Sequence, residues 1–237
     1  MKNSAELDNR LLACASLVRT GSVAADIGSD HAYLPIYLVK NQICPRAIAS
    51  DINKGPVERA RINIAVSGLS DKIDVLLADG LDKAAPLLPD DIIIAGMGGE
   101  LIRDIIAASE YVKNPGVRLI LQPMTMPEIL REYLAENGFN IIDERICASR
   151  SKYYQIICAE YDGVKRIFDP HELLLGKKNI ERIRVHGAVD DERELVARVA
   201  NAAGKRIEGM RQSEHPDTDA IGKDQKLLNF CKELLEC

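Results

Sequence analysis

Short apolar runs alternate with helical patterns of apolar positions along the first two thirds of the chain. Five runs end in turn residues and are mostly followed by a helical pattern, which predicts a parallel sheet covered by helices on both faces. Two later runs are joined by a short polar turn, which requires antiparallel pairing and places one antiparallel strand in the edge region of the sheet. The predicted strands are residues 23–25, 46–51, 72–78, 91–95, 118–121, 139–148 and 153–161. The predicted helices that accompany them are residues 4–18, 32–39, 55–67, 101–109 and 127–137.

The pattern changes after the last predicted strand, and the rest of the chain has helical signals only. Residues 189–211 and 220–235 carry apolar side chains at helical spacing. The turn between them, at residues 215–219, makes a helical hairpin of the kind found in short antiparallel coiled coils. We therefore divide the chain into a sheet domain, residues 1–163, and a helical domain, residues 164–237.

The composition is that of a soluble globular protein, with 46% hydrophobic and 28% charged residues in a chain of 237. The first residues are polar, unlike a signal peptide, and no apolar run approaches the ~20 residues needed to span a bilayer, so we expect a cytoplasmic protein. The six cysteines form no CxxC pair, and none has a histidine at metal-ligand spacing. We therefore expect reduced, buried cysteine side chains and no metal site. The net charge is -5, yet residues 163–211 hold 11 basic and 8 acidic groups, which allows a locally positive surface.

Acids and glycines gather where the predicted parallel strands end. Asp26, Asp51 and Asp79 finish the first three strands, at the edge where ligands bind in an open parallel sheet. Carboxylates on one edge repel one another unless they serve cationic or hydrogen-bond-donating groups, although a chance scatter of loop acids is the simpler alternative. The fourth and fifth strands end in Gly96-Met97-Gly98-Gly99 and Gln122-Pro123.

The first turn discriminates between nucleotide ligands. Enzymes that bind dinucleotides use G-x-G-x-x-G so that the pyrophosphate rests on a helix N-terminus. Here the turn is Gly28-Ser29-Asp30-His31-Ala32-Tyr33, which keeps only the first glycine and has the carboxylate of Asp30 at the second glycine position. This argues against NAD and favours a ligand with a cationic end and no phosphate, such as S-adenosylmethionine.

The other strand ends suit this ligand. Asp51 could accept hydrogen bonds from both ribose hydroxyl groups, and Asp79 could accept the amino hydrogens of the adenine. His31 either contacts the ligand or is a structural hydrogen-bonding residue. The remaining contacts that we expect are Ile52 and Asn53 at the adenine and the backbone of Gly96 at the methionine end, while the Gly98-Gly99 pair gives a turn without side chains.

These motifs, in this order, resemble the bacterial tRNA (adenine-N1)-methyltransferases of the TrmK type over residues 4–162. The resemblance rests on Asp26-Ile-Gly-Ser-Asp-His-Ala-Tyr-Leu-Pro35, Asp79-Gly80-Leu81, Gly96-Met-Gly-Gly99 and Leu121-Gln-Pro123. It implies a Rossmann-like class I methyltransferase sheet with a C-terminal helical hairpin, S-adenosyl-L-methionine as cofactor, and N1 of adenine 22 in tRNA as the methyl acceptor. By resemblance, Arg10 holds the cofactor carboxylate or the substrate. The cofactor site implied in this way is lined by Asp26, Gly28, His31, Asp51, Asn53, Asp79, Gly80, Gly96 and Met97, to which we add Asp30 and Ile52.

On the substrate side, methyltransferases that act on exocyclic amines commonly carry Asn/Asp-Pro-Pro-aromatic after the fourth strand, which this chain lacks. A ring nitrogen needs no strong base, and we assign no catalytic residue. Tyr153 or Tyr154 could stack on an extruded base, or both are core residues of an edge strand. The basic side chains expected at tRNA phosphates are Arg145, Arg150, Lys152, Lys165, Arg166, Lys177, Lys178, Arg182 and Arg184. The substrate contacts that we predict are Gly98, Gln122, Pro123, Arg150, Tyr154, Lys177 and Lys178.

Other functions stay open from the sequence. The chain could methylate another RNA, a protein or a small molecule, or it could be a non-catalytic cofactor-binding scaffold whose helical hairpin docks a protein. An NAD-dependent dehydrogenase is the least favoured, because of Asp30. The partner that we predict is tRNA, and the sequence implies no protein partner.

Overall fold

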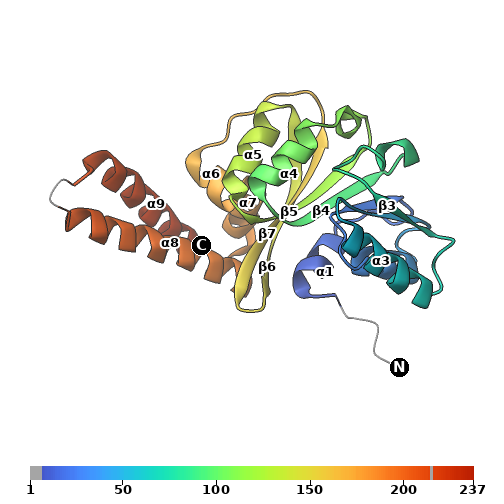
Figure 1. The fold of residues 1–237 in the computed structure, drawn as a ribbon. Helices are drawn as coiled ribbons and strands as arrows, with labels where there is room; N and C mark the ends of the chain where they lie inside the picture. Colours follow the sequence, from blue (N-terminus) through green and yellow to red (C-terminus); the bar gives the residue numbers. More distant parts are fainter. Residues whose placement is uncertain (1–6, 214–215) are drawn as a thin grey trace.

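The centre of the fold is a seven-stranded sheet (Figure 1) in the computed structural model, which describes residues 7–213 and 216–237. Its strands are β1 (Ala24–Ile27), β2 (Ala47–Asp51), β3 (Ile73–Leu77), β4 (Asp91–Gly98), β5 (Arg118–Thr125), β6 (Phe139–Ser149) and β7 (Lys152–Tyr161). Across the sheet they follow the order β3-β2-β1-β4-β5-β7-β6. The first five strands are parallel, and β7 runs antiparallel to both β5 and β6. The predicted α/β class and the antiparallel strand in the edge region are therefore confirmed.

Helices cover both faces of the sheet. They are α1 (Asn9–Ala15), α2 (Tyr33–Lys40), α3 (Lys54–Val66), α4 (Gly99–Ala107), α5 (Pro127–Glu136), α6 (Pro170–Leu175), α7 (Lys177–His186), α8 (Asp190–Arg211) and α9 (Thr218–Glu236), with two short 3-10 turns, Ala85–Leu87 and Glu110–Lys113. The helices α4 and α5 lie on one face, and α1, α2 and α3 lie on the other (Figure 1). Within the described ranges, no helix combines the length and the apolar character that a membrane crossing needs.

The first helix is shorter than predicted. It begins at Asn9, where the side chain of Asp8 accepts a hydrogen bond from the N–H of Leu11 at 2.9 Å, a typical N-terminal cap. It ends at Ala15, because the next turn has the tighter hydrogen-bond pattern of a 3-10 helix. The predicted residues 4–6 lie outside the described part of the chain.

Three of the parallel strands run further than predicted toward their carboxyl ends. The strand β1 continues through Asp26 to Ile27, so Asp26 is a strand residue and not the first residue of a turn. The strands β4 and β5 continue side by side to Gly98 and Thr125. Pairing between these two ends thus extends the sheet where the sequence pattern indicated only turns.

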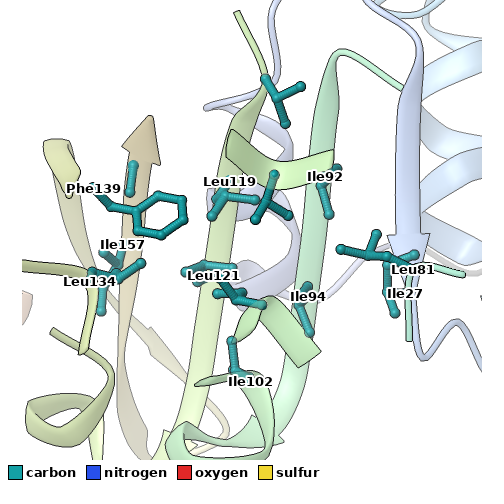
Figure 2. Packing of buried hydrophobic residues seen from close by; sticks show 14 of the residues in the cluster. Ile27, Leu81, Ile92, Ile94, Ile102, Leu119, Leu121, Leu134, Phe139 and Ile157 are labelled. Carbon is teal, nitrogen blue, oxygen red and sulfur yellow. The ribbon is translucent and has the colours of Figure 1, made fainter. Parts of the chain in front are cut away.

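The main hydrophobic core lies between the sheet and the helices α4 and α5 (Figure 2). Ile92 and Ile94 of β4 face this core, whereas Ile93 between them faces a second core beneath α1 and α2. All three side chains are fully buried. Because both faces of the central strands are covered, these strands are continuous apolar runs, which is why the sequence pattern identifies them.

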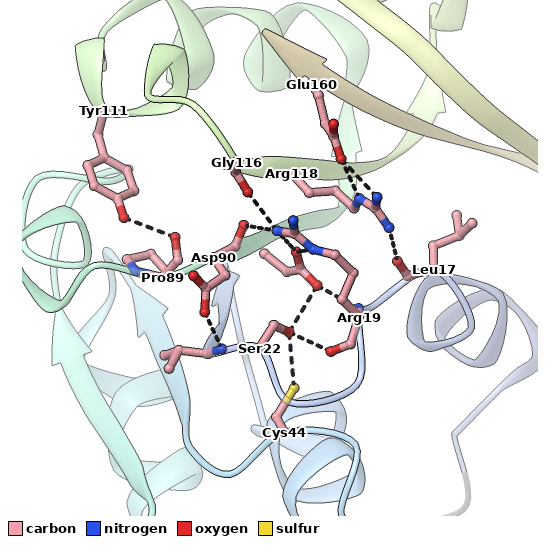
Figure 3. A network of polar contacts seen from close by, with 12 residues as sticks. Leu17, Arg19, Ser22, Cys44, Pro89, Asp90, Tyr111, Gly116, Arg118 and Glu160 are labelled. Carbon is pink, nitrogen blue, oxygen red and sulfur yellow. Dashed lines mark hydrogen bonds and ion pairs between the residues drawn. The ribbon is translucent and has the colours of Figure 1, made fainter.

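A polar network joins the elements at the amino-terminal edge of the sheet (Figure 3). The carboxylate of Asp91, at the start of β4, is fully buried and accepts hydrogen bonds from the backbone N–H and the Nε of Arg19, both at 2.7 Å, and from the hydroxyl of Ser22 at 3.0 Å. Arg118, at the start of β5, pairs with Glu160 of β7 at 2.8 Å. A buried charge is tolerated only when it is paired and hydrogen-bonded, so this network fixes the approach of the chain to β1 and β4.

The cysteines are free, and four of them are buried as predicted. Cys147 is only partly buried and Cys237 is exposed, so the prediction of buried side chains was wrong for these two. Burial raises the pKa of the Cys158 thiol to about 12, which keeps it protonated at neutral pH.

The tail is helical, and α8 and α9 form the predicted hairpin, which projects away from the sheet (Figure 1). Val196 and Ala200 of α8 pack against Cys231 and Leu234 of α9 inside this hairpin. Leu175 of α6 and Ile180 and Ile183 of α7 belong to the same cluster, and both helices also pack against α5 or β6 of the sheet domain. The division of the chain after residue 163 stays a prediction.

Candidate cofactor and substrate site

The candidate site lies at the carboxyl ends of β1 and β4. These strands are neighbours in the sheet, although the chain leaves β1 for β2 and β3 on one side and continues from β4 to β5 on the other. The order of the strands therefore reverses between β1 and β4. In open parallel sheets, ligands bind beyond the strand ends at such a switch point.

Asp26 is the acid at the centre of this site. It lies in β1 between β2 and β4, and its side chain is buried. Burial raises the pKa of its carboxyl to about 6. The Ser29 hydroxyl and the Arg10 guanidinium lower that pKa, and the carboxylate of Asp51 raises it further. A donor-rich or cationic ligand would stabilise the ionised form of Asp26.

The turn after β1 depends on its glycine. Gly28 has a φ of +80°, which side chains rarely adopt, and the N–H groups of Gly28 and Ser29 donate to the carbonyl oxygen of Ser50 at 2.7 and 2.8 Å. A Cβ on residue 28 would lie 2.1 Å from Cε of Met97, so the methionine covers this turn. The predicted contacts Gly28 and Met97 thus meet across β1 and β4.

Asp30 and His31 lie beyond the turn, toward α3. Asp30 is exposed and pairs with Arg59 of α3, whose Nε lies 3.0 Å from the carboxylate. The Nε2 of His31 lies 3.3 Å from the other oxygen of Asp30, and its ring stacks on Tyr33 with the centroids 4.9 Å apart. The charge of Asp30 is therefore balanced within the protein, and the predicted ligand contacts of Asp30 and His31 stay predictions.

The ends of β2 and β3 hold the remaining acids. One oxygen of Asp51 accepts the N–H of Asn53 at 2.7 Å, which fixes the orientation of the carboxylate. Ile52 follows Asp51 and is 59% exposed. Asp79 is exposed in the loop after β3, and the next residue, Gly80, has a φ of +51°. These side chains lie on neighbouring strand ends, as a ligand that spans β2 and β3 requires.

Arg10 of α1 reaches across the sheet to the end of β5. Its Nη1 donates to Oε1 of Gln122 at 2.6 Å, and the same oxygen accepts the N–H of Gly96 at 3.1 Å. Gln122 is fully buried, and its Nε2 donates to the carbonyl oxygen of Pro123 at 2.9 Å. The sequence did not reveal this link between α1, β4 and β5. The predicted substrate contacts of Gln122 and Pro123, both buried, stay predictions.

Gly98 and Gly99 form the junction between β4 and α4. A Cβ on residue 99 would lie 2.2 Å from the carbonyl oxygen of Met126, so no side chain fits there. A Cβ on residue 98 would lie 3.3 Å from Oγ1 of Thr125. Two register shifts interrupt the pairing of β4 with β5 just before this junction. Such bulges re-aim side chains and are common next to active sites.

Tyr153 and Tyr154 lie on opposite faces of β7, as successive strand residues do. The guanidinium of Arg198 in α8 lies over the ring of Tyr153, 4.6 Å from its centroid. Tyr154 is half-buried and pairs across the hairpin with Cys147, which packs toward the core beneath α1. Of the two tyrosines, Tyr154 is therefore the one on the face of the sheet that carries Arg10.

Most basic side chains expected at tRNA phosphates are engaged within the protein. Five form ion pairs: Arg145 with Asp143, Arg166 with Asp162, Lys177 with Glu172, Lys178 with Glu181, and Arg182 with Glu192. Arg184 lies 5.5 Å from the ring centroid of Phe230. Within residues 7–213 and 216–237, the exposed side chains of Arg150, Lys152 and Lys165 form no ion pair.

The residues present fit S-adenosylmethionine. Within the described chain, one oxygen of Asp51 has no protein donor and is available to ribose hydroxyl groups, and the buried hydroxyl of Ser50 has no hydrogen-bond partner. Gly96 leaves the end of β4 without a side chain, and Arg10 could bind a carboxylate. The part of the chain that the structure describes contains no group of three or more acid, His or Cys side chains placed to hold a metal ion.

Comparisons with known proteins agree with this geometry. The model of the methyltransferase domain family matches residues 7–157. The tRNA (adenine(22)-N(1))-methyltransferase of Bacillus subtilis (strain 168) is 40% identical over 169 residues, which cover 68% of this chain and 71% of that protein. The crystal structure of the B. subtilis m1A22 tRNA methyltransferase TrmK is 30% identical, with a TM-score of 0.83 over 97% of this chain and 99% of that chain. The protein Sp1610 of Streptococcus pneumoniae, in complex with S-adenosyl-L-methionine, is 30% identical, with a TM-score of 0.81 over 97% and 100%.

The sheet, the acids at its strand ends and the family match define a Rossmann-like, S-adenosylmethionine-dependent methyltransferase. The similarity to the solved structures extends over nearly the whole chain and includes the helical tail. The chain belongs to the family of bacterial tRNA (adenine(22)-N1)-methyltransferases.

Proposed function

We propose that this protein transfers the methyl group of S-adenosylmethionine to N1 of adenine 22 in tRNA. The observation that carries the proposal is the match to the B. subtilis m1A22 tRNA methyltransferase over 97% of the chain. The acids and glycines at the switch point between β1 and β4 support it, because they suit this cofactor. Because its substrate is tRNA, we expect the protein to act in the cytoplasm.

The reaction requires little from the protein beyond positioning. The N1 atom of adenine has its own lone pair and attacks the sulfonium methyl group that the cofactor supplies, so no strong base is needed. Asp51 holds the ribose and Arg10 the carboxylate of the cofactor. Gly98 and Gly99 keep the end of β4 free of side chains beside the acceptor.

The deciding experiment is a methylation assay with the purified protein, labelled cofactor and unmodified tRNA transcripts. We expect 1-methyladenosine in transcripts with adenine at position 22 and none in transcripts with guanosine there. Transfer of label to proteins or metabolites of an extract, but not to tRNA, would overturn the proposal in favour of another acceptor. Cofactor binding without any transfer would instead indicate a non-catalytic scaffold.

We infer that the tip of the β6–β7 hairpin contacts tRNA phosphates. Arg150 and Lys152 are exposed there, without ion pairs in the described chain, and β7 begins at the edge of the sheet where β5 ends. Arg150 and Ser151 have φ values of +48° and +63°, the conformation that a two-residue hairpin turn requires, so the turn itself presents these side chains at its tip. Lys177 and Lys178, which form ion pairs, become weaker candidates than the sequence suggested.

Replacing Arg150 and Lys152 together by Glu should weaken tRNA binding. The slope of log K against the logarithm of the salt concentration should become shallower by about two, one for each lost phosphate contact. Cofactor affinity should not change. The matched control is Lys40→Glu with Lys72→Glu, two exposed lysines at the opposite edge of the sheet. Binding by filter retention at several salt concentrations measures the effect. If both double variants had the same slope of log K against log salt, the proposed contact of the hairpin tip with tRNA phosphates would be wrong.

A further inference from the structure

The sheet divides at its carboxyl edge, between β5 and β7. These strands pair from Arg118–Glu160 to Leu121–Ile157 and no further. Beyond that point β5 stays with β4 up to Thr125, whereas β7 stays with β6 back to Lys152. The two strands therefore part directly beside the site that Gln122 and Arg10 define.

Met124 lies on the β5 side of this division. Its sulfur is 3.7 Å from Nε2 of Gln122, the amide that links Arg10 and Gly96, and its side chain is 42% exposed. In the pairing of β5 with β4, the register passes from Met97–Pro123 to Gly98–Thr125 and leaves Met124 without a partner. The bulge thus turns a flexible, apolar side chain toward the site.

Tyr154 lies on the β7 side. The last pair of β5 and β7 is Leu121–Ile157, and Met124 and Tyr154 each lie three residues beyond it, on the two strands as they separate. Tyr154 faces the α1 side of the sheet with Ile156, which is in the core beneath α1. Within the described residues, its hydroxyl group has no hydrogen-bond partner. A half-exposed phenol ring and a thioether therefore flank the division of the sheet.

The position of this pair decides which ligand it suits. The acids that fit the ribose and adenine of the cofactor lie on or directly after β1, β2 and β3, and Met97 of β4 lies against Gly28 at the end of β1. The strand β7 is three places from β1 in the sheet, a separation of about 14 Å at roughly 4.8 Å per strand. A ligand between β5 and β7 is thus beyond the cofactor, on the side where the methyl acceptor must be.

We propose that Tyr154 and Met124 hold the target adenine between them after it leaves the tRNA stack. This inference rests on the proposed function. The planar ring of an extruded purine needs apolar contacts on its faces and a free edge for reaction at N1. A tyrosine ring and a methionine sulfur supply such faces without a charge. Tyr154 is then a substrate-binding residue, and Tyr153 is a structural residue that supports α8 through Arg198.

The first test compares Tyr154→Leu with Tyr154→Phe. The leucine variant should lower kcat/KM for tRNA roughly 10-fold or more, since stacking of a base on an aromatic ring is lost, and the phenylalanine variant should restore most of it. Cofactor affinity by calorimetry should equal that of the parent in both, which shows that both are folded. Equal kcat/KM values for the leucine variant and the parent would overturn the proposal. Absence of methylation by the parent would instead overturn the proposed function.

The second test observes Met124 directly. The sequence has five methionines, so methyl-labelled methionine gives few signals, and Met124→Leu identifies the one that matters. With S-adenosylhomocysteine bound, a transcript with adenine 22 should shift the Met124 methyl signal upfield through the ring current of the base. A transcript with an abasic nucleotide at position 22 should not. The same Met124 signal with both transcripts would overturn the proposal.

Discussion

Replacing Arg131 by methionine is expected to lower the free energy of unfolding by roughly 3–5 kcal/mol, the usual cost of leaving a buried charge without its partner. Arg131 of α5 and Glu144 of β6 are both fully buried, and Nε lies 2.7 Å from Oε1. The guanidinium also donates to Gln155 at 2.6 Å and to the carbonyl oxygen of Leu173 at 2.7 Å. Chemical denaturation of the variant and the parent measures the difference.

The same ion pair attaches the tail to the sheet domain. The second oxygen of Glu144 accepts the N–H of Lys178, at the start of α7, at 2.9 Å. Gly176, between α6 and α7, has a φ of +88°, and a Cβ there would lie 2.5 Å from both carboxylate oxygens. We therefore expect Arg131→Met to accelerate amide hydrogen exchange in α6 and α7 more than in β1.

Arg145→Met is the matched control for this prediction. Arg145 lies next to Glu144 on β6 and pairs with Asp143 at 2.8 Å, but its side chain is 50% exposed. An exposed ion pair contributes little, so this variant should cost less than about 1 kcal/mol. Equal costs for Arg131→Met and Arg145→Met would show that the buried pair does not support the fold. Addition of Glu144→Leu to Arg131→Met should recover part of the loss, because no charge then stays buried alone.

The sequence predicted the sheet because its central strands are buried on both faces. A short β-branched run such as Ile92-Ile93-Ile94, followed by glycines, is typical of a strand that is covered on both faces. The candidate site followed from the same pattern, since the carboxyl ends of parallel strands meet at one edge. This is why Asp26, Asp51 and Asp79 could be placed together before any contact was known.

The partners of polar side chains could not be predicted in this way. Asp30 contacts Arg59, 29 positions away in the sequence, and Gln122 contacts Arg10, 112 positions away. No local sequence pattern indicates either contact. Arg131 is of a residue type that is mostly exposed, yet it shares the buried face of α5 with Leu134, and the packing of α6 buries it completely. Such contacts depend on tertiary packing, which periodicity does not encode.

The lengths of β4 and β5 were underestimated at their carboxyl ends for a related reason. Glycines and a proline at positions 96, 98 and 123 indicate turns, but β4 and β5 continue through them because each supplies the other with hydrogen bonds. The register shifts that this requires leave Gly96 and Met124 unpaired. Irregular pairing of this kind is where the site differs from an ideal sheet.

Asp26→Asn is expected to stabilise the protein at neutral pH while it weakens cofactor binding. The pKa of Asp26 is about 6 in the folded protein, above its ordinary value of 3.8. The folded state therefore holds this proton more tightly than the unfolded state, and stability is lost as the pH rises from about 4 to 6. The loss is about 3 kcal/mol in total. An amide does not ionise, so the stability of the variant relative to the parent should rise by about that amount between pH 4 and pH 7, measured by urea denaturation.

Asp71→Asn, in the exposed turn before β3, is the control, and its difference from the parent should not grow over this range. A difference for Asp26→Asn that is equally independent of pH would contradict the prediction. With cofactor present, ionisation of Asp26 should become favourable instead of unfavourable. A ligand with cationic and hydrogen-bond-donating groups binds the ionised carboxylate, so the affinity of the parent should increase as the pH rises through 6. The asparagine variant should bind at least about 10-fold more weakly at pH 7.5, because a charged hydrogen-bond acceptor is lost. Both results together would show that the carboxylate of Asp26 serves ligand binding and not folding, because it destabilises the free protein and is stabilised only by its ligand.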